Sequence, residues 1–222
     1  NALGRYLNQA NEPVEFNYTT GVKNDTVNLF VDGAVAEDPD FIMNVNTGAG
    51  DDRLILEVTT DAAARPDLAS TSIDGGTGTN TLVVRSDVGM NAGNTFKSFK
   101  NFQNYEVEGA GSSHNFTNLN GVKTVVVATD AGTSNTLVDL PSDLASISLS
   151  GKNQNIGNAN NADQTFATLD IKAAKAKVLT LNLDNTARVD GVLSLANLNI
   201  GHNTATDLSA VEQLNIVSNG KR

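Results

Sequence analysis

Apolar and polar residues alternate with a period of two along most of the chain. The alternation is clearest over residues 26–31, 53–58 and 81–84. A period of two places successive side chains on opposite faces of an extended backbone, so it is typical of β-strands. The same pattern predicts further strands at residues 105–107, 123–127, 146–149, 168–171, 178–183, 193–200 and 213–217.

Two short segments have a helical pattern instead. Residues 1–11 place Leu3, Tyr6 and Leu7 at helical spacing, and residues 170–178 carry three alanines. Alanine has the highest intrinsic helix propensity, so we expect a short helix at each segment. The remainder of the chain is expected to be strand and turn.

Three segments of the chain repeat without gaps. Residues 20–27, 47–54 and 75–82 align over their whole length, and the spacing between their starts is nearly constant. Each segment follows a short apolar run and precedes a predicted strand. The repeating unit is therefore a strand, a glycine-rich turn and a second strand.

A second repeat lies near the C-terminus. Residues 181–185, 198–203 and 214–219 each begin with Leu-Asn and an apolar residue, at a shorter spacing than the first repeat. Spacings of about 16 to 28 residues suit one coil of a β-solenoid, in which inward Leu, Ile and Val stack and corner Asn residues form ladders. The predicted fold is an all-β, parallel β-helix-like solenoid with irregular coils. A β-sandwich with two Greek keys also contains many short strands and is the alternative.

We expect one elongated domain over residues 1–222, cut from a larger protein because the chain begins at Asn1 without Met. Residues 151–164 are polar and nearly strandless, so they form either a long loop or a break between sub-domains. The sequence contains no stretch apolar and long enough for a transmembrane helix.

Charge and cysteine content exclude several classes of function. The net charge of −10 disfavours binding to the phosphates of nucleic acids. The absence of cysteine excludes disulfides, thiolate metal sites and cysteine nucleophiles. Clustered carboxylates attract divalent cations, so calcium is a candidate ligand.

The glycine-rich turns are the candidate calcium sites. Glycines allow a tight turn that directs carbonyl oxygens toward one point, and Asp adds the hard anionic oxygen that calcium prefers. Of the three copies of the glycine-rich segment, residues 47–54 are the most complete. The copy at 75–82 carries Asn80 in place of Asp, and the copy at 20–27 carries Lys23 in place of a glycine. The turns could equally be plain solenoid or hairpin turns without an ion. The predicted metal-binding residues are Gly48, Gly50, Asp51, Asp52, Asp74, Gly76, Gly78, Asn80 and Asp25.

The sequence offers little for catalysis. It contains two histidines, His114 and His202, and none of the nucleophile, zinc or phosphate-loop motifs of common enzymes. Carboxylates lie on predicted strands, but the sequence does not pair them. Sugar-cleaving grooves usually carry aromatic platforms, and this chain has no Trp and three Tyr. We therefore predict that the chain is not an enzyme.

The turns at residues 48–54 and 75–82 resemble repeat-in-toxin calcium turns, and they resemble those of Gram-negative surface-layer (S-layer) proteins. The runs at residues 99–107 and 119–125 are similar in style to the same proteins and to large type I-secreted adhesins. The resemblance implies type I secretion in an unfolded state and folding in external calcium. It also implies self-assembly into a porous lattice held on lipopolysaccharide.

The expected function is that of an extracellular, self-associating and calcium-stabilised module of a cell-surface lattice. An adhesin module that binds a glycan or a host surface is the first alternative. A polysaccharide-active β-helix enzyme is the second, and two carboxylates beside a basic residue in a cleft would favour it.

Overall fold

The computed structural model describes sixteen strands and, within the described residues, no helix. It describes residues 14–31, 41–58, 71–85, 98–109, 113–129, 132–150, 164–184, 192–201 and 208–219. The odd-numbered strands are β1 (Val14–Thr19), β3 (Phe41–Asn46), β5 (Thr71–Asp74), β7 (Phe99–Lys100), β9 (Ser113–Asn115), β11 (Ser134–Val138), β13 (Gln164–Lys172) and β15 (Leu193–Ile200). The even-numbered strands are β2 (Thr26–Val31), β4 (Arg53–Val58), β6 (Thr81–Val84), β8 (Asn104–Val107), β10 (Thr124–Val127), β12 (Ser146–Ser150), β14 (Val178–Asp184) and β16 (Gln213–Asn219).

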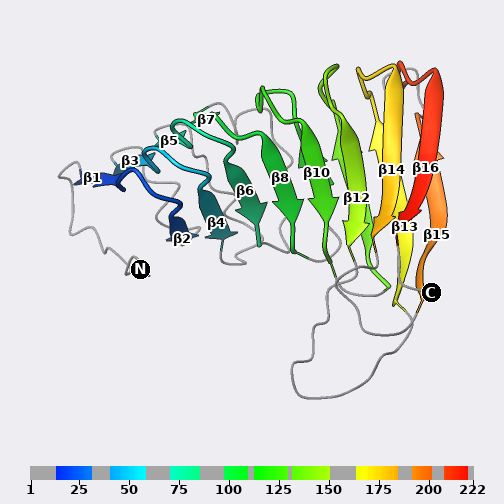
Figure 1. Cartoon of the computed structure of the whole chain (residues 1–222), viewed down its shortest axis with the longest axis horizontal. Helices are drawn as coiled ribbons and strands as arrows, with labels where there is room; N and C mark the ends of the chain where they lie inside the picture. The colour runs from blue at the N-terminus through cyan, green and yellow to red at the C-terminus, as the bar shows by residue number, and fades with distance from the viewer. Residues whose placement is uncertain are drawn as a thin grey trace.

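The strands lie in three sheets, and each described strand pairing is parallel. All even-numbered strands form one eight-stranded sheet, ordered β16-β14-β12-β10-β8-β6-β4-β2. The odd-numbered strands form two four-stranded sheets, β1-β3-β5-β7 and β15-β13-β11-β9. We call each odd strand and the even strand after it a rung, so that eight rungs follow one another along the molecule (Figure 1).

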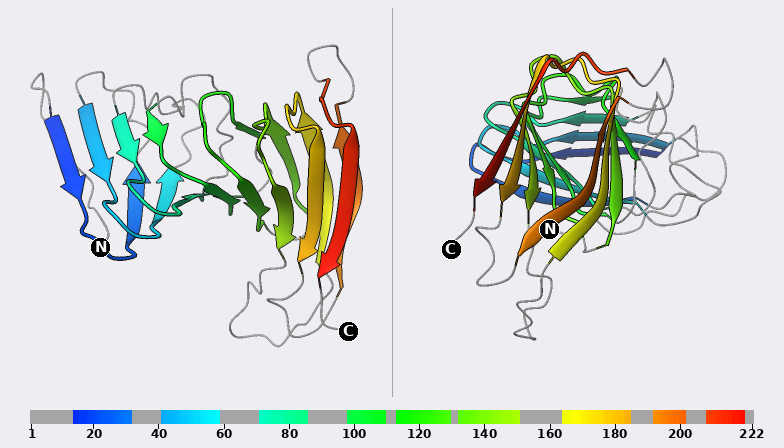
Figure 2. Two further views of the ribbon diagram at one scale, coloured as in Figure 1. Left: turned by 45° about the horizontal axis from the view of Figure 1, so that its top comes forward. Right: turned by 90° about the vertical axis from the view of Figure 1, so that its right-hand side faces the viewer.

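The core lies between the even sheet and the two odd sheets, as the end-on view in Figure 2 shows. Alternate residues of each strand point inward, and those at the same register stack from rung to rung. On the even sheet Leu54 pairs with Leu82, which pairs with Tyr105, and all three are fully buried. The buried residues join in one hydrophobic cluster that extends from Leu29 to Leu181.

The arrangement is consistent with the β-helix or solenoid-like class that the sequence predicts. A β-sandwich built of Greek keys requires antiparallel neighbours, and the described pairings are parallel. The spacing of the glycine-rich repeat is one full rung, since Thr26 pairs with Arg53 and Arg53 with Thr81.

Our interpretation of the C-terminal repeat as whole coils is wrong. Its copies begin on β14, β15 and β16, and β15 lies in a different sheet from the other two. The spacing between successive copies is therefore half a rung. A full rung separates β14 from β16, as the pairing of Val178 with Gln213 shows.

The helix predicted at residues 170–178 is also wrong. Strand β13 extends to Lys172, and Ala173 then takes a positive φ of 50° that ends the strand. Ala174 and Ala176 are buried with an exposed residue between them, which is a period of two. Both alanines belong to the hydrophobic core cluster, and this packing overrides helix propensity.

Two other predicted features lie outside the described residues, namely the helix at residues 1–11 and residues 151–163 of the polar segment. The strands on either side of that segment pair within the same sheets. Ile147 of β12 pairs with Leu181 of β14, and Asn135 of β11 pairs with Leu169 of β13.

Aromatic residues fill the core at the fourth and fifth rungs, where one odd sheet ends at β7 and the other begins at β9. Phe99 and Phe102 lie with ring centroids 6.5 Å apart. Tyr105 contacts His114 and Phe116 edge-on, at 5.5 Å and 4.9 Å. These large side chains bridge the part of the core where the odd face changes from one sheet to the other.

Candidate functional site

The three glycine-rich segments stack on one another at a single corner of the molecule, between the odd and even strands of rungs one to three. The amide of Ala49 donates to the carbonyl oxygen of Gly21 at 3.0 Å, and the amide of Thr77 donates to that of Gly48 at 3.0 Å. The same positions of the repeat therefore meet, as the alignment of the sequence predicts. We call this region the glycine corner.

The glycines of the corner are required by close contact between rungs. Gly48 and Gly76 have φ values of 79° and 69°, a region that side chains disfavour. A Cβ at Gly76 would lie 1.8 Å from the carbonyl oxygen of Gly48, and one at Gly78 would lie 2.0 Å from that of Gly50. Gly48 and Gly78, like the other predicted glycines, thus allow backbone to stack on backbone.

A ladder of side-chain oxygens connects the rungs at the residue before each even strand. The amide of Asp25 donates to Asp52 Oδ1 at 2.8 Å, and the amide of Asp52 donates to Asn80 Oδ1 at 2.9 Å. The amide of Asn80 donates in turn to Gln103 Oε1 at 2.8 Å. Each rung thus satisfies a backbone donor of the rung before it, as expected for corner ladders.

A second ladder occupies the neighbouring position and has the opposite direction. The amide of Asp51 donates to Asn24 Oδ1 at 2.9 Å, and the amide of Thr79 donates to Asp51 Oδ1 at 2.7 Å. Together, the two ladders give the second rung a donor and an acceptor toward both of its neighbours.

Asp74 stabilises the turn of the third rung. Its Oδ1 accepts from the amide of Gly76 at 2.8 Å and from Asn101 Nδ2 at 2.7 Å, and its Oδ2 lies 3.1 Å from Lys100 Nζ. Partial burial acts to raise the pKa of Asp74, but these hydrogen bonds and the lysine outweigh it and lower the pKa below 3.8. The carboxylate is therefore ionised at neutral pH.

The corner offers calcium one buried anionic oxygen that has no hydrogen-bond partner. Asp52 is 2% exposed, and its Oδ2 is unpaired. Oδ1 atoms of Asp51, Asp52 and Asp74 already accept hydrogen bonds. Within the described ranges no group of three or more His, Asp or Glu side chains lies close enough to hold a metal ion. The nine predicted residues thus share a corner, where their described contacts connect rungs.

Sequence reasoning missed several residues of the ladders. Thr47 is fully buried, and its Oγ1 donates to the carbonyl oxygen of Gly75 at 2.8 Å. Thr20 donates to the carbonyl oxygen of Thr47 in the same way. The alignment contains the signal, because both threonines occupy its first position. Gln103 and Asn101 were harder to find, because the fourth rung has a shorter turn without glycine.

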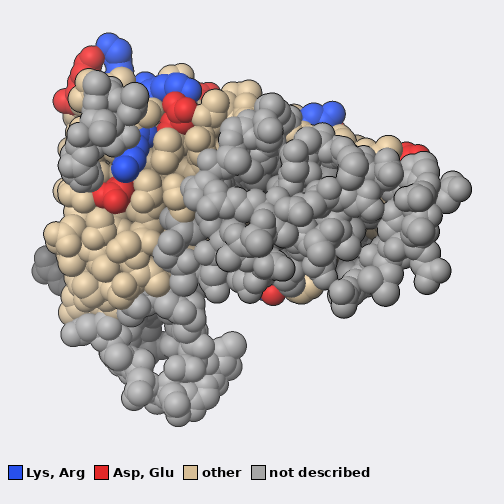
Figure 3. All heavy atoms as spheres, turned by 180° about the vertical axis from the view of Figure 1, so that it is seen from behind, with Lys and Arg blue, Asp and Glu red and all other residues tan. Residues whose placement is uncertain are grey.

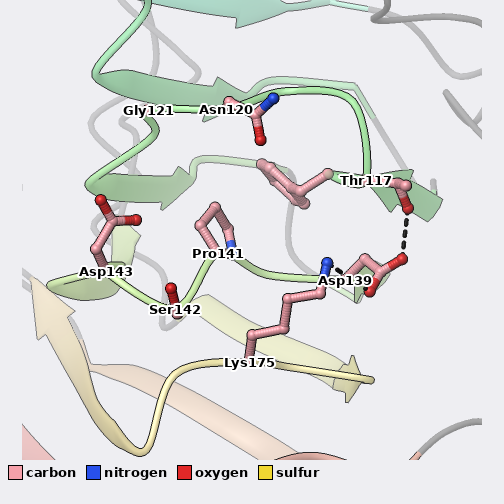
Figure 4. A pocket seen from close by; sticks show the side chains of 9 residues that line it. Thr117, Asn120, Gly121, Asp139, Pro141, Ser142, Asp143 and Lys175 are labelled. Atoms are coloured by element: carbon pink, nitrogen blue, oxygen red, sulfur yellow. Dashed lines mark hydrogen bonds and ion pairs between the residues drawn. The ribbon is translucent and has the colours of Figure 1, made fainter.

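A surface pocket of about 320 Å³ lies at the same side of rungs five to seven (Figure 4). Asp139 lines it and has a φ of 61°. Its Oδ2 accepts a hydrogen bond from Thr117 Oγ1, and its Oδ1 lies 3.2 Å from Lys175 Nζ. The hydrogen bond from Thr117, opposed by burial and reinforced by Lys175, lowers the pKa of Asp139. Asn120 and Ser142 also line the pocket, beside Phe116 and Pro141.

The histidines and the carboxylates on or beside the strands are the groups that catalysis would require, and those described have structural contacts. His114 is fully buried, its Nδ1 lies 2.7 Å from Tyr105 Oη, and burial lowers its pKa to about 3. His202 lies outside the described residues. On the outer face of the even sheet, Glu106 and Glu108 form ion pairs with arginines, and neither lines the pocket of Figure 4.

No protein-family model, curated protein or solved structure matches the chain. The part of the chain described here contains no helix with the length and apolar character needed to cross a membrane.

Proposed function

We propose that the chain is a β-solenoid that serves as a structural, self-associating module of an extracellular cell-surface lattice. The observation that carries the proposal is the glycine corner, where backbone and side-chain hydrogen bonds connect each rung to the next. Because the polar atoms of these residues form hydrogen bonds between rungs, they stabilise the stacking of rungs along the long axis. A role in shape rather than chemistry fits that use of the most distinctive motif of the sequence.

The burial of His114 and the ion pairs of Glu106 and Glu108 support a non-enzymatic role. A general acid or base must reach its substrate, and His114 is enclosed in the core. Glu106 and Glu108 stand beside basic residues, as a β-helix enzyme requires. However, Arg53 bonds both carboxylates and Arg85 bonds Glu108, so the four charges compensate one another.

We further propose that calcium adds stability at the glycine corner without being required for the fold. Carboxylate oxygens are the donor type that calcium prefers, and Asp52 Oδ2 is buried and unpaired. Asp51 lies at the preceding position of the same rung, and Asp74 lies on the next rung at the same corner. Bound calcium would neutralise the carboxylates there, while the ladders hold the rungs together in either case.

The substitution Asp52→Asn tests this metal proposal. Asn80, one rung further, occupies the equivalent position, and its side-chain Nδ2 donates to the carbonyl oxygen of Asn101 at 3.1 Å. Asn at position 52 should preserve the ladder and remove the unpaired anion. We expect calcium to raise the melting temperature of the native chain, and D52N to abolish that rise while folding normally.

Asp143→Asn is the matched control, because Asp143 is exposed and pairs with Lys123 far from the glycine corner. It should leave the calcium response unchanged. A native chain whose melting temperature is the same in calcium, magnesium and chelator would remove calcium from the proposal and leave the hydrogen-bonded scaffold.

The structural function itself is tested by assembly. The purified chain should form sheets or large oligomers in calcium, detected by light scattering and electron microscopy, and should bind vesicles that contain lipopolysaccharide more strongly than vesicles without it. A chain that stays monomeric and unbound under all these conditions would contradict a lattice function.

Glycan binding is the second candidate, and the pocket of Figure 4 favours it. Asn120, Ser142 and Asp139 offer both donors and acceptors beside the apolar Pro141. Lys175 balances the charge of Asp139, and Lys123 balances that of Asp143, which also lines the pocket. Neutral polar pockets of this kind suit polyhydroxylated ligands. Saturable binding of a monomer on a glycan array, lost in Asn120→Ala, would support this candidate.

A further inference from the structure

The last rung of the molecule exposes apolar side chains at register positions that are buried on the rung before it. Leu179 and Leu181 of β14 are 0% and 2% exposed, whereas their register partners on β16, Leu214 and Ile216, are 36% and 62% exposed. The inward stack of the even sheet therefore ends at β16 without a cover among the described residues. In the same rung, Leu208 is 68% exposed.

Exposed large hydrophobic residues concentrate at the two ends of the molecule. The described residues include nine of them, of which two belong to the first rung and five to the last. Those of the first rung are Val22 and Phe30, and those of the last rung are Val192, Leu208, Leu214, Ile216 and Val217. Apolar surface at both ends of one axis is typical of a contact surface.

Three of the four terminal strands lack the charges that normally prevent pairing at sheet edges, and the fourth, β1, carries only Glu15. Strands β15 and β16 pair on one side only, and neither contains a charged residue or a proline. Strand β2, at the opposite edge of the even sheet, likewise has no charge. Charged residues and prolines are the usual protection of an exposed edge strand, so these edges are open to further strands.

Few charged side chains lie on the described surface beside the last rungs. In Figure 3, which shows the molecule from behind, the described surface beside the C-terminal rungs is largely uncharged, and its Lys, Arg, Asp and Glu residues lie toward one side. Lys177 and Glu212, which precede β14 and β16, are both highly exposed and form an ion pair at 2.9 Å.

We infer that the last rung of one molecule docks on the first rung of a second copy, so that β16 pairs with β2 and β15 with β1. This inference rests on the proposed self-associating function and names its contact. All described pairings are parallel, so a copy displaced along the long axis meets the last rung with the correct strand direction. The contact continues the rung-to-rung interface already present within the molecule.

The two ends match when their inward residues are aligned. Leu214 and Ile216 of β16 then lie opposite Val27 and Leu29 of β2, which are the inward residues of the first rung. On the outer face, the same register brings exposed Val217 opposite Phe30.

On the odd face, Leu198 and Ile200 of β15 are partly buried inward residues, and so are Phe16 and Tyr18 of β1. The two rings of β1 stack with centroids 6.4 Å apart and offer a broad apolar surface. An end that meets a different end does not close on itself, so this contact predicts open filaments rather than dimers.

Complementary end variants test the docking. I216K/V217K places ammonium groups on the last rung, and V22K/F30K places them on the first. The native chain should form filaments as its concentration rises, and each variant alone should associate at least roughly tenfold more weakly. An equimolar mixture of the two variants should form one-to-one heterodimers, because each variant retains one intact end. I42K, at an exposed apolar residue of an inner strand, is the matched control and should polymerise normally.

Disulfide trapping tests the register without relying on charged variants. The chain contains no cysteine, so N215C and N28C introduce the only thiols. Neighbouring strands bring their Cα atoms within the range of a disulfide, so a mixture of the two variants should cross-link. Cross-linking of N215C with itself, or a native chain that stays monomeric up to high concentration, would overturn end docking. If the I216K/V217K and V22K/F30K variants formed calcium-dependent sheets as readily as the native chain, end docking would also be overturned. The lattice function would remain in place.

Discussion

Individual residues in this molecule are constrained most where rungs touch. Gly76 combines a positive φ with a carbonyl oxygen of the rung below at a distance that admits no side chain. His114 and Tyr105 form a polar pair inside an otherwise apolar core, where burial raises the pKa of Tyr105 well above 10.0 and lowers that of His114. We therefore expect the free energy of unfolding to respond to an added Cβ at Gly76 and to an added proton on His114.

Substitution of Gly76 by Ala separates backbone strain from rung contact. Gly132 has a similar positive φ of 79°, but nothing lies within 4 Å of where its Cβ would be. We expect G132A to lower the free energy of unfolding by about 1 kcal/mol and G76A to lower it by about 3 kcal/mol or more. Urea unfolding measures both, and equal losses would contradict a contact role for Gly76.

The burial of His114 predicts acid sensitivity. Its pKa is about 3 in the folded chain and 6.5 in the unfolded chain, so the unfolded state binds the extra proton between these values. Stability should therefore fall as pH decreases from about 6.5 toward 3, by about 1.4 kcal/mol for each pH unit. The lowered pKa values of Asp74 and Asp139 act only below about pH 4, because their usual value is 3.8.

The variant H114Q provides the comparison, because glutamine is polar and does not titrate. Unfolding curves measured between pH 6.5 and pH 4 should have a slope against pH that is smaller by one proton in H114Q. Parallel pH profiles of the two proteins would show that protonation of His114 does not govern this range.

At the scale of elements, sequence patterns predicted the even-numbered strands, β13 and β15, and missed the shortest strands. Strands β2, β4 and β6 have the predicted bounds, because each follows a copy of the glycine-rich repeat. Strands β7 and β9 have two and three residues, too few for a period of two to be recognised. The nine candidate site residues do meet, but which partner each oxygen selects depends on the register between rungs, and a single sequence does not specify that register.

Ion pairs on the outer face of the even sheet connect three strands. Arg53 of β4 extends past β6 to Glu106 and Glu108 at 2.7 and 3.2 Å, and Arg85 bonds Glu108 at 2.7 Å. Because the glutamate side chains are only 11% and 12% exposed, their loss should be felt more than that of a surface pair.

We expect E108Q to lower the free energy of unfolding by about 1–2 kcal/mol, a value reduced for the partial exposure of Arg53 and Arg85. E212Q is the control, since Glu212 and Lys177 are exposed, and it should change stability by a few tenths of a kcal/mol at most. Thermal or urea unfolding compares the two, and an equal effect would mean that the network adds nothing beyond a surface pair.

At the scale of the whole molecule, the strand pairings join each rung only to the rungs before and after it. Stability in such a chain is a sum of rung and interface contributions, so the ends open more readily than the middle. The last rung has the most exposed inward residues, whereas the aromatic cluster fills the core at rungs four and five.

Hydrogen exchange at low protein concentration should therefore show the least protection in β15 and β16 and the greatest in β8 and β10. Mass spectrometry of peptides from each rung measures the gradient. Uniform protection along the chain would indicate instead that the eight rungs unfold as one cooperative unit.

The even spacing of the first three rungs has a consequence for how such a chain can change in length. Thr26, Arg53 and Thr81 succeed one another at nearly equal steps along the sequence, and the glycine corner repeats the same bonds at each step. A duplicated segment would find equivalent hydrogen-bond partners on the rungs before and after it. The part of the molecule formed by the first three rungs can therefore grow by whole units. In the other half the step between neighbouring even strands is unequal, being much shorter from Asn104 to Thr124 than from Val178 to Gln213. An inserted unit would meet no equivalent there, so the architecture of that half is fixed.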